Sequence, residues 1–363
     1  MLADPRPDGR RSPSSLDPMV NISLLRNLVP LASLLATDRA ELARHARVGA
    51  YAPGQIVFSR GEPAKTIPYL LSGEVEIFDG LDSRVVRAET PEARQPLAQG
   101  ARRATTATCV KAAQVLLVDR EQLDLVLTWA QTGGVEVVEF SNKSGDGDEQ
   151  NDWMTALLQN QAFHLIPPGN IAQLFSCMQA AFYEAGKTII RQGNPGDAYF
   201  IITAGRVQVV REESDGINET EVSQLSVGRG FGEEALVSGQ PRNATVRALT
   251  DTQLMRVTAA DFARLLKAPL MREITLEEIA TGTQLIDVRL PDEYRAGHLP
   301  DAINLPLSRL RDLAVELDPA RICAVYCDSG RRSASATYLL CERGFDARLI
   351  SGGVEAGLLT DLV

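Results

Sequence analysis

Two kinds of hydrophobic pattern divide the chain. Apolar positions at helical spacing over residues 25–47 are followed, over residues 51–78, by short apolar runs separated by glycine and proline turns. Short apolar runs separated by such turns are typical of a small all-β sandwich or barrel. From residue 284 onward, strand and helix patterns alternate, which predicts a parallel α/β sheet with helices on both faces. The strands are expected at 284–288, 303–306, 322–326 and 347–350, and the helices at 291–295, 308–316 and 333–343.

The β pattern occurs twice, at a constant offset of 132 residues. The matching pairs are Tyr51 and Tyr183, Gly54 and Gly186, Gly61 and Gly193, Pro63 and Pro195, Gly73 and Gly205, and Val75 and Val207. The repeat predicts a duplicated module over residues 25–135 and 155–270. Each copy should end in a capped helix, with Asp119 before residues 121–129 and Thr258 before residues 261–266. Residues 136–154, rich in Gly, Ser and acidic residues, are expected to be a linker, and residues 1–24 a disordered tail.

Composition narrows the class of protein. A chain of 363 residues should form two to four domains. Its net charge of −10 argues against a protein that binds duplex DNA, and no apolar run approaches the length of a membrane span. The N-terminus has no apolar segment of a secretory signal. Five scattered cysteines form no disulfide framework, so a cytoplasmic location is expected. With three histidines and no metal-type spacing of Cys and His, no metal is expected.

The second copy carries two polar motifs, Gly230-Phe-Gly-Glu-Glu-Ala-Leu236 and Pro241-Arg-Asn-Ala-Thr-Val246. Gly232 would allow the backbone to approach a ligand, Glu233 could accept from ribose hydroxyls, and Arg242 could bind a phosphate with two hydrogen bonds. Each motif alone could equally be a turn with exposed charges. Together, inside a repeated β module, they resemble the phosphate-binding cassette of cyclic-nucleotide-binding domains, which are eight-stranded, jelly-roll-like β-rolls flanked by helices. The resemblance implies cAMP or cGMP as a regulatory ligand, bound by Phe231, Gly232, Glu233, Glu234, Ala235, Arg242, Asn243, Ala244 and Thr245.

The first copy keeps only part of this cassette. Its Arg102-Arg-Ala-Thr105 resembles the second motif, but no Phe-Gly-Glu precedes it. A structural or dimer-forming role is therefore expected for residues 25–135, and a homodimer remains open.

A cysteine ends the predicted strand at 322–326, and a polar turn with one glycine joins it to the next helix. At this place Cys327 would meet the positive end of the helix dipole, with Arg331 and Arg332 close by, and all three favour the nucleophilic thiolate. Residues 273–357 resemble a rhodanese, a single-domain sulfurtransferase, in three motifs: Ile286-Asp-Val-Arg289 with the following Gly-His-Leu-Pro, the loop from Cys327, and Leu349-Ile-Ser-Gly-Gly353. Asp301 departs from the glycine that is usual there. The resemblance implies an active loop of Cys327, Asp328, Ser329, Gly330, Arg331 and Arg332.

The length of this loop favours sulfur transfer over phosphate chemistry. It closes from Cys327 to Arg332 in six residues, one fewer than phosphatases of related geometry need. In the implied reaction Cys327 takes a sulfur from a donor such as thiosulfate and passes it to cyanide, a thiol or a protein acceptor. Arg331 and Arg332 would steer anionic donors, Ser333 would cap the helix, Asp287 and Arg289 would make structural contacts under the loop, and His298 would stabilise a turn.

The overall expectation is a multidomain protein, with two β-roll domains of the α+β class followed by a rhodanese α/β domain over residues 271–363. No helix-turn-helix pattern follows Leu270, so a DNA-binding regulator is disfavoured. The predicted function is a cytoplasmic sulfurtransferase that responds to cyclic nucleotide, with residues 261–272 as the connecting segment and with no nucleic-acid or membrane partner. The alternative is a cyclic-nucleotide receptor whose rhodanese domain is a docking module or a thiol sensor.

Overall fold

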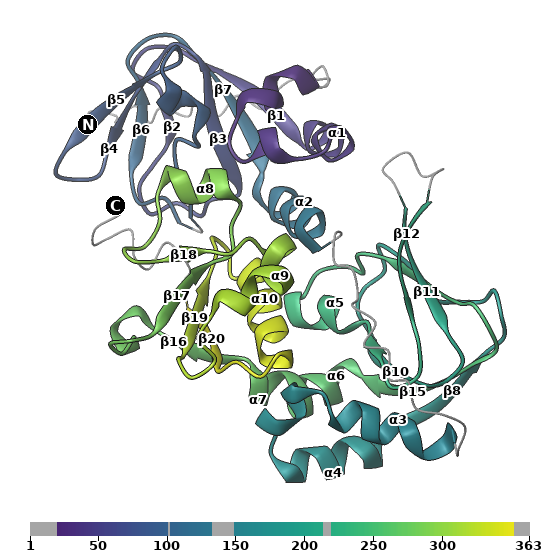
Figure 1. Ribbon diagram of the computed structural model, residues 1–363. Coiled ribbons are helices and arrows are strands. Elements are labelled where there is room, and N and C mark those ends of the chain that lie inside the picture. The colour runs from purple at the N-terminus through teal and green to yellow at the C-terminus, as the bar shows by residue number, and fades with distance from the viewer. Residues whose placement is uncertain (1–19, 101, 133–148, 213–218, 352–363) are drawn as a thin grey trace, which may run out of the picture.

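The computed structural model describes residues 20–100, 102–132, 149–212 and 219–351. Two antiparallel β-rolls lie on either side of a smaller unit built on a parallel sheet (Figure 1). The expected linker over residues 136–154 lies outside the described residues as far as residue 148, and so does the expected tail as far as residue 19. Beyond those limits both segments are structured. Val20 is buried, a 3-10 turn spans Ile22–Asn27, and helix α3 begins at Glu149.

The first β-roll has one sheet in the order β1-β7-β3 and a second in the order β2-β6-β4-β5. Its strands are β1 (Ala46–Tyr51), β2 (Ile56–Phe58), β3 (Thr66–Ser72), β4 (Glu74–Phe78), β5 (Ser83–Arg87), β6 (Thr106–Cys109) and β7 (Ala113–Asp119). The helical pattern over residues 25–47 is shorter than its spacing suggests. It divides into 3-10 turns and α1 (Ala36–Arg44), because Pro30 has no N–H to continue a helix. Asp119 caps α2 (Arg120–Thr132) by accepting from the Gln122 N–H at 3.0 Å.

The second β-roll repeats this arrangement, with sheets in the orders β13-β10-β15-β8 and β12-β11-β14-β9. Its strands are β8 (Gln179–Tyr183), β9 (Thr188–Ile190), β10 (Ala198–Ala204), β11 (Val207–Glu212), β12 (Glu219–Leu225), β13 (Gly230–Phe231), β14 (Thr245–Ala248) and β15 (Thr252–Thr258). Its helices are α3 (Glu149–Leu158), α4 (Pro168–Cys177), α5 (Glu233–Ser238), α6 (Ala259–Phe262) and α7 (Ala268–Leu270). Thr258 accepts from the Asp261 N–H, as expected of a cap, and a π-helical turn over Ala263–Lys267 joins α6 to α7.

The predicted repeat is present in the backbone. Strands β3 and β10 begin 132 residues apart and have equal lengths. The paired glycines also share a left-handed conformation, with φ of 81° and 83° at Gly54 and Gly186 and of 88° and 86° at Gly73 and Gly205. The same turns therefore recur at the same places in the two β-rolls.

The third unit has a five-stranded, fully parallel sheet in the order β16-β20-β19-β17-β18. Its strands are β16 (Arg272–Ile274), β17 (Gln284–Asp287), β18 (Ile303–Asn304), β19 (Cys323–Tyr326) and β20 (Ala347–Ile350), and its helices are α8 (Pro291–Ala296), α9 (Leu310–Leu313) and α10 (Arg331–Glu342). All four residues of β19 are buried, as expected for a strand covered on both faces. Helix α10 begins two residues before the predicted position. The helix predicted at 308–316 is mostly 3-10, with α9 at its centre.

One hydrophobic cluster joins the second β-roll to the parallel-sheet unit. Phe262 of α6 lies between Tyr199 of β10 and Tyr338 of α10, with ring centroids 5.3 and 6.2 Å apart. Helix α10 also packs against α5 (Figure 1). Burial of a large apolar side chain is worth about 1.5–3 kcal/mol, so this shared cluster holds the two units together.

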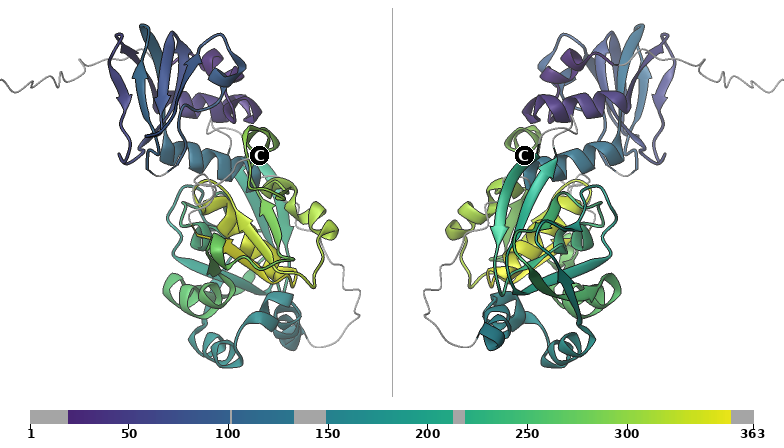
Figure 2. Two further views of the ribbon diagram at one scale, coloured as in Figure 1. Left: turned by 90° about the vertical axis from the view of Figure 1, so that its left-hand side faces the viewer. Right: turned by 90° about the vertical axis from the view of Figure 1, so that its right-hand side faces the viewer.

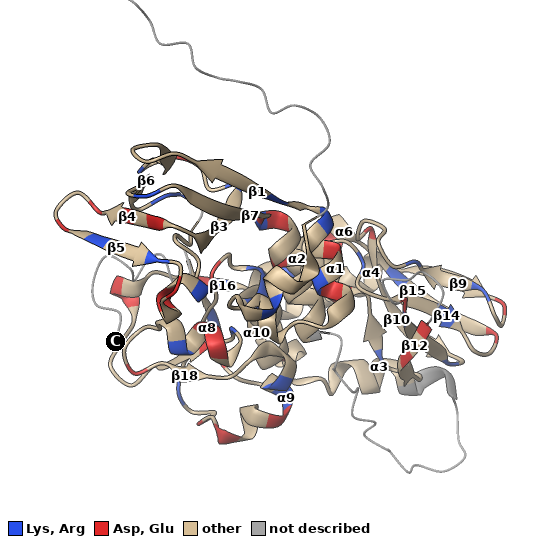
Figure 3. Ribbon diagram, turned by 90° about the horizontal axis from the view of Figure 1, so that it is seen from above, with Lys and Arg blue, Asp and Glu red and all other residues tan. Residues whose placement is uncertain are grey.

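The first β-roll contacts the same unit through α2, which lies between the two in both views of Figure 2. Gln131 of α2 accepts a hydrogen bond from the Leu307 N–H at 3.1 Å, and the Ser33 hydroxyl donates to Asp292 of α8 at 3.1 Å. Basic and acidic positions are interspersed over all three units (Figure 3). In the part of the chain that the structure describes, no helix is long and apolar enough to cross a membrane.

Candidate functional site

The Cys327 side chain lies at the carboxyl end of β19, where two backbone N–H groups face its sulfur. Its Sγ accepts from the backbone N–H groups of Gly330 (3.2 Å) and Ser333 (3.4 Å), and the Ser333 hydroxyl is 3.3 Å away. Gly330 precedes α10 with φ of 88°, a conformation that glycine adopts without strain and that turns these N–H groups toward the sulfur. These N–H groups and the helix N-terminus would both stabilise negative charge on Sγ. The loop after Cys327 thus turns back so that two of its backbone N–H groups face the sulfur.

A network of ion pairs among charged side chains, most of them buried, holds this loop in place. The Arg289 guanidinium pairs with Asp287 at 2.7 Å and with Asp328 at 3.1 Å. Arg332 donates to both carboxylate oxygens of Glu293, at 2.7 and 2.9 Å, and to Asp328 at 3.0 Å. Asp287 and Arg289 therefore have the structural role expected of them. The donor-steering role expected of Arg332 is not supported, because its side chain is 1% exposed and its terminal nitrogens are taken by carboxylates.

Two carboxyl groups pair with Arg332, and their pKa values change in opposite directions. Burial raises the pKa of Glu293, although Arg332 opposes the effect. For Asp328 burial acts in the same direction, but Arg289 and Arg332 together hold its pKa below the usual range. The loop thus keeps an ionised carboxylate next to Cys327.

His298 also has its expected place, at a turn. Its Nδ1 lies 2.9 Å from the Tyr294 carbonyl oxygen, and its ring stacks on that tyrosine with centroids 3.7 Å apart. Ser333 donates from its hydroxyl to the Gly330 carbonyl at 3.1 Å, inside the first turn of α10.

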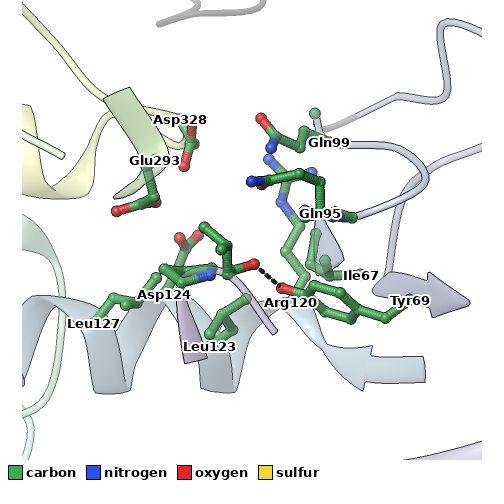
Figure 4. Close-up of a pocket in the computed structure, with 14 residues that line it drawn as sticks. Ile67, Tyr69, Gln95, Gln99, Arg120, Leu123, Asp124, Leu127, Glu293 and Asp328 are labelled. Atoms are coloured by element: carbon green, nitrogen blue, oxygen red, sulfur yellow. Dashed lines mark hydrogen bonds between the residues drawn. The ribbon is translucent and has the colours of Figure 1, made fainter. Parts of the chain in front are cut away.

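A cavity of about 40 Å³ separates the loop from the first β-roll. Figure 4 shows Asp328 and Glu293 on one side of it, and Gln95 and Gln99 from the first β-roll on the other. Asp124 of α2 lies at its edge. Burial raises the pKa of this carboxyl, with Arg332 acting in the opposite direction.

In the second β-roll, the cassette residues surround α5. Gly232 precedes the helix with φ of 89°, and a Cβ there would lie only 2.7 Å from the Arg242 guanidinium. Arg242 is buried and donates to the Gly232 carbonyl (2.6 Å), the Ala198 carbonyl (2.6 Å) and Asp197 (3.0 Å). The structure therefore brings Gly232 and Arg242 together, as a shared phosphate site requires.

Glu233 lies near the parallel-sheet unit. Burial raises its pKa, while Arg311 and Arg242 oppose the effect. Across the interface, burial and the neighbouring Glu233 raise the pKa of Glu342 at the end of α10 to about 8. The carboxylate expected to bind ribose is thus close to the charges of another unit.

The remaining cassette residues have structural contacts. Phe231 stacks on Phe200 with centroids 5.3 Å apart, Ala235 and Ala244 are buried, and Glu234 lies near Arg211. The Thr245 hydroxyl accepts from the Gln192 N–H at 3.0 Å, and the Asn243 carbonyl accepts from Arg211 at 3.1 Å.

The first β-roll retains the buried arginine, but one residue later than the motif suggests. Arg103, not Arg102, occupies the place of Arg242, since the Gly61 N–H donates to the Arg103 carbonyl as the Gly193 N–H donates to that of Arg242, both at 2.8 Å. Its guanidinium donates to the Thr66 carbonyl and lies over Phe58. A 3-10 turn at Pro91–Arg94 stands where α5 would be, so the described part of this β-roll has no counterpart of Gly232 or Glu233.

Sequence reasoning missed several residues that complete these sites. Asp197, Gln240 and Glu293 contact the expected residues, and Asp124 reaches the Cys327 loop from the first β-roll. None lies in a recognisable pattern with its partner, and Asp124 is more than 200 positions away from Arg331. Within the described residues, no group of three or more His, Cys, Asp or Glu side chains could hold a metal ion.

Comparison with known proteins identifies two domains in the chain. Residues 181–268 match the cyclic nucleotide-binding domain model, and residues 272–358 match the rhodanese-like domain model. A cAMP-dependent protein kinase regulatory subunit from Dictyostelium discoideum is 32% identical over 149 residues, which are 41% of this chain and 45% of that protein. A cGMP-dependent protein kinase from Caenorhabditis elegans is 26% identical over 196 residues, which are 54% of this chain and 23% of that protein. The chain thus spans less than half the length of these relatives.

Among solved structures, the regulatory domain of Toxoplasma gondii PKA with cAMP aligns with a TM-score of 0.30 and 20% identity, covering 68% of this chain and 91% of that one. The two family matches fall on the second β-roll and on the parallel-sheet unit. The chain carries a cyclic nucleotide-binding domain followed by a C-terminal rhodanese-like domain.

Proposed function

We propose that the chain is a sulfurtransferase whose activity responds to a cyclic nucleotide. The Cys327 thiolate attacks the outer sulfur of thiosulfate, the S–S bond breaks, and sulfite leaves with the electron pair. The product is a persulfide on Cys327. Cyanide, a thiol or an acceptor protein then attacks the outer sulfur of that persulfide, and the Cys327 thiolate leaves and is restored.

The observation that carries this proposal is the pair of backbone N–H donors at the Cys327 sulfur. The N–H groups of Gly330 and Ser333 and the N-terminus of α10 face one sulfur, which suits a thiolate or a persulfide anion. Asp328 is paired with Arg289 and Arg332 and so adds little repulsion.

Transfer of sulfur from thiosulfate to cyanide tests the reaction. We expect the wild type to form thiocyanate and Cys327→Ser to show only the uncatalysed background. Cys177→Ser is the matched control, since Cys177 is a half-buried thiol in α4, outside the rhodanese-like unit. Equal rates from the wild type and Cys327→Ser would refute catalysis by this residue.

The nucleotide part of the proposal rests on Gly232 and Arg242, with Glu233 beside them at the start of α5. Calorimetry with cAMP and cGMP should show binding by the wild type and a loss of at least 100-fold in Arg242→Ala, as expected when a charged phosphate contact is removed. Arg247→Ala is the control, because this arginine pairs with Glu219. Responsiveness requires that saturating nucleotide change the sulfur-transfer rate, and an unchanged rate would refute it.

A second candidate function is a nucleotide receptor with a thiol sensor. It is favoured by the same backbone N–H donors, because a thiolate held by Gly330 and Ser333 is also the form of cysteine that oxidants attack. Mass spectrometry after incubation with thiosulfate separates the two. An added sulfur atom that a thiol reductant removes supports transfer, whereas a sulfenic acid or a mixed disulfide on Cys327 supports sensing.

The proposal includes a cytoplasmic location and no structural metal. All five cysteines are free thiols, and a catalytic thiolate needs reducing surroundings. A homodimer built on the first β-roll remains part of the proposal, to be tested by light scattering.

A further inference from the structure

Arg331 differs from the other arginines around Cys327 in its exposure. Its side chain is 31% exposed, compared with 1% for Arg332 and 2% for Arg289. Those two are held by buried carboxylates. Of the three, Arg331 is therefore the one that can meet an anion arriving from solvent.

Two residues from outside the rhodanese-like unit hold Arg331. Asp124 of α2 places its Oδ2 3.7 Å from Nη1. Gln240, with its side-chain oxygen turned toward the guanidinium, accepts from Nε at 2.8 Å and from Nη1 at 3.3 Å. One contact comes from the first β-roll, and the other comes from the segment between the two cassette motifs of the second.

We propose that Asp124 and Gln240 are positioning residues that hold Arg331 back from the Cys327 site and so set its affinity for anionic sulfur donors. The inference rests on the proposed function, because it concerns the donor of that reaction. It adds that the first β-roll acts on the sulfur-transfer site, and that the cassette reaches this site through Gln240.

The position of Gln240 connects it to the nucleotide. It lies between Glu233 and Arg242, and its N–H contacts the Ser238 hydroxyl at the end of α5. A bound phosphate would draw the Arg242 guanidinium from the Gly232 carbonyl and Asp197. Movement of the intervening segment would break the contact between Gln240 and Arg331 and free the arginine. By thermodynamic linkage, if bound nucleotide raises the affinity for the anionic donor by some factor, then bound donor raises the affinity for the nucleotide by the same factor.

Alkylation of Cys327 tests the positioning without turnover. Iodoacetate and iodoacetamide have nearly the same shape, but only iodoacetate is an anion. The rate of Cys327 alkylation by iodoacetate divided by the rate with iodoacetamide, both measured by peptide mass spectrometry, therefore reports how strongly the site favours an anion. We expect Asp124→Asn and Gln240→Ala to raise this ratio about 2- to 5-fold, as for a partly exposed ion pair. Glu121→Gln, which removes an exposed charge from the first turn of the same helix, should leave the ratio within about 1.5-fold.

Two further measurements separate positioning from a general charge effect. In an Arg331→Gln background, Gln240→Ala should have no effect on the ratio. In turnover, Gln240→Ala should lower the KM for thiosulfate by a similar factor with kcat unchanged, and added nucleotide should no longer change KM.

Each of the other outcomes refutes one part of the proposal or the proposed function beneath it. An unchanged alkylation ratio in both variants overturns the positioning roles, and so does failure of both reagents to modify Cys327 in every variant. A raised ratio in a protein without sulfur transfer retains the positioning and refutes the proposed function. A nucleotide effect on KM that persists in Gln240→Ala overturns the route through this residue.

Discussion

Replacing Arg332 by alanine removes the guanidinium that joins Asp328 of the Cys327 loop to Glu293 of α8. Glu293 would remain buried, and Asp328 half-buried, with one cation fewer. Removal of one partner from a buried ion pair costs about 3–5 kcal/mol, and we expect a loss of this size in the free energy of unfolding. The three hydrogen bonds of Arg332, at 2.7, 2.9 and 3.0 Å, place it in this class.

Helix α8 offers a matched control. Arg295 pairs with Asp292 on the same helix as Glu293, but its side chain is 73% exposed. Such a pair contributes about 0.2–1 kcal/mol. Glu293→Gln provides an intermediate case, because Arg332 then keeps Asp328 and the loss should be smaller than that of Arg332→Ala.

Urea unfolding followed by circular dichroism measures the three variants. With a slope of about 1–3 kcal/mol per molar, Arg332→Ala should lower the midpoint by at least about 1 M. Arg295→Ala should leave it nearly unchanged. A loss below about 1 kcal/mol for Arg332→Ala, or equal losses for the two arginines, would refute the claim that burial makes this pair essential.

Three other substitutions should change the stability of the folded protein. Because the folded protein raises the pKa of Glu342 from 4.5 to about 8, it binds this proton more tightly than the unfolded chain, so the free energy of unfolding should fall as pH rises between these values. Glu342→Gln should make this loss of stability smaller. At about 1.4 kcal/mol per pKa unit, the difference above pH 8 is at most about 5 kcal/mol. Equal pH profiles of thermal unfolding for the wild type and the variant would contradict the burial argument. Arg103→Ala should destabilise the first β-roll by about 2–4 kcal/mol in urea unfolding, since its buried guanidinium serves backbone carbonyls, and a neutral result would show that the arginine is dispensable. Asp301 has φ of 60°, so Asp301→Gly should stabilise the protein by up to about 1 kcal/mol and raise the thermal midpoint slightly. A lowered midpoint would contradict the claim that the backbone at Asp301 is strained.

Local patterns in the sequence were sufficient for the fold. The offset of 132 residues marked both β-rolls, and the alternation after residue 284 marked the parallel sheet, because turns and strand periodicity are local properties. Asp301 shows the limit of this reasoning. Its departure from glycine was visible in the sequence, whereas its left-handed backbone was not.

Contacts between units could not be predicted in this way. The segment over residues 261–272 was the only expected connection, yet α5 packs directly on α10, and Asp124 and Gln240 reach Arg331 from opposite units. Such contacts depend on how folded units dock. The same limit applies to Arg332, since the sequence shows an arginine beside a cysteine, and only the fold shows that Glu293 buries its charge.

The cluster shared by Phe262 and Tyr338 has a consequence for synthesis of the chain. The second β-roll is complete before α10 has been made, so the surface around Phe262 stays without its cover while residues 271–342 are translated. At about 5–20 residues per second this interval lasts roughly 4–14 s. During that time an apolar surface is open to chaperones and to other nascent chains, and a ribosome that stalls within α8 or α9 would leave it exposed.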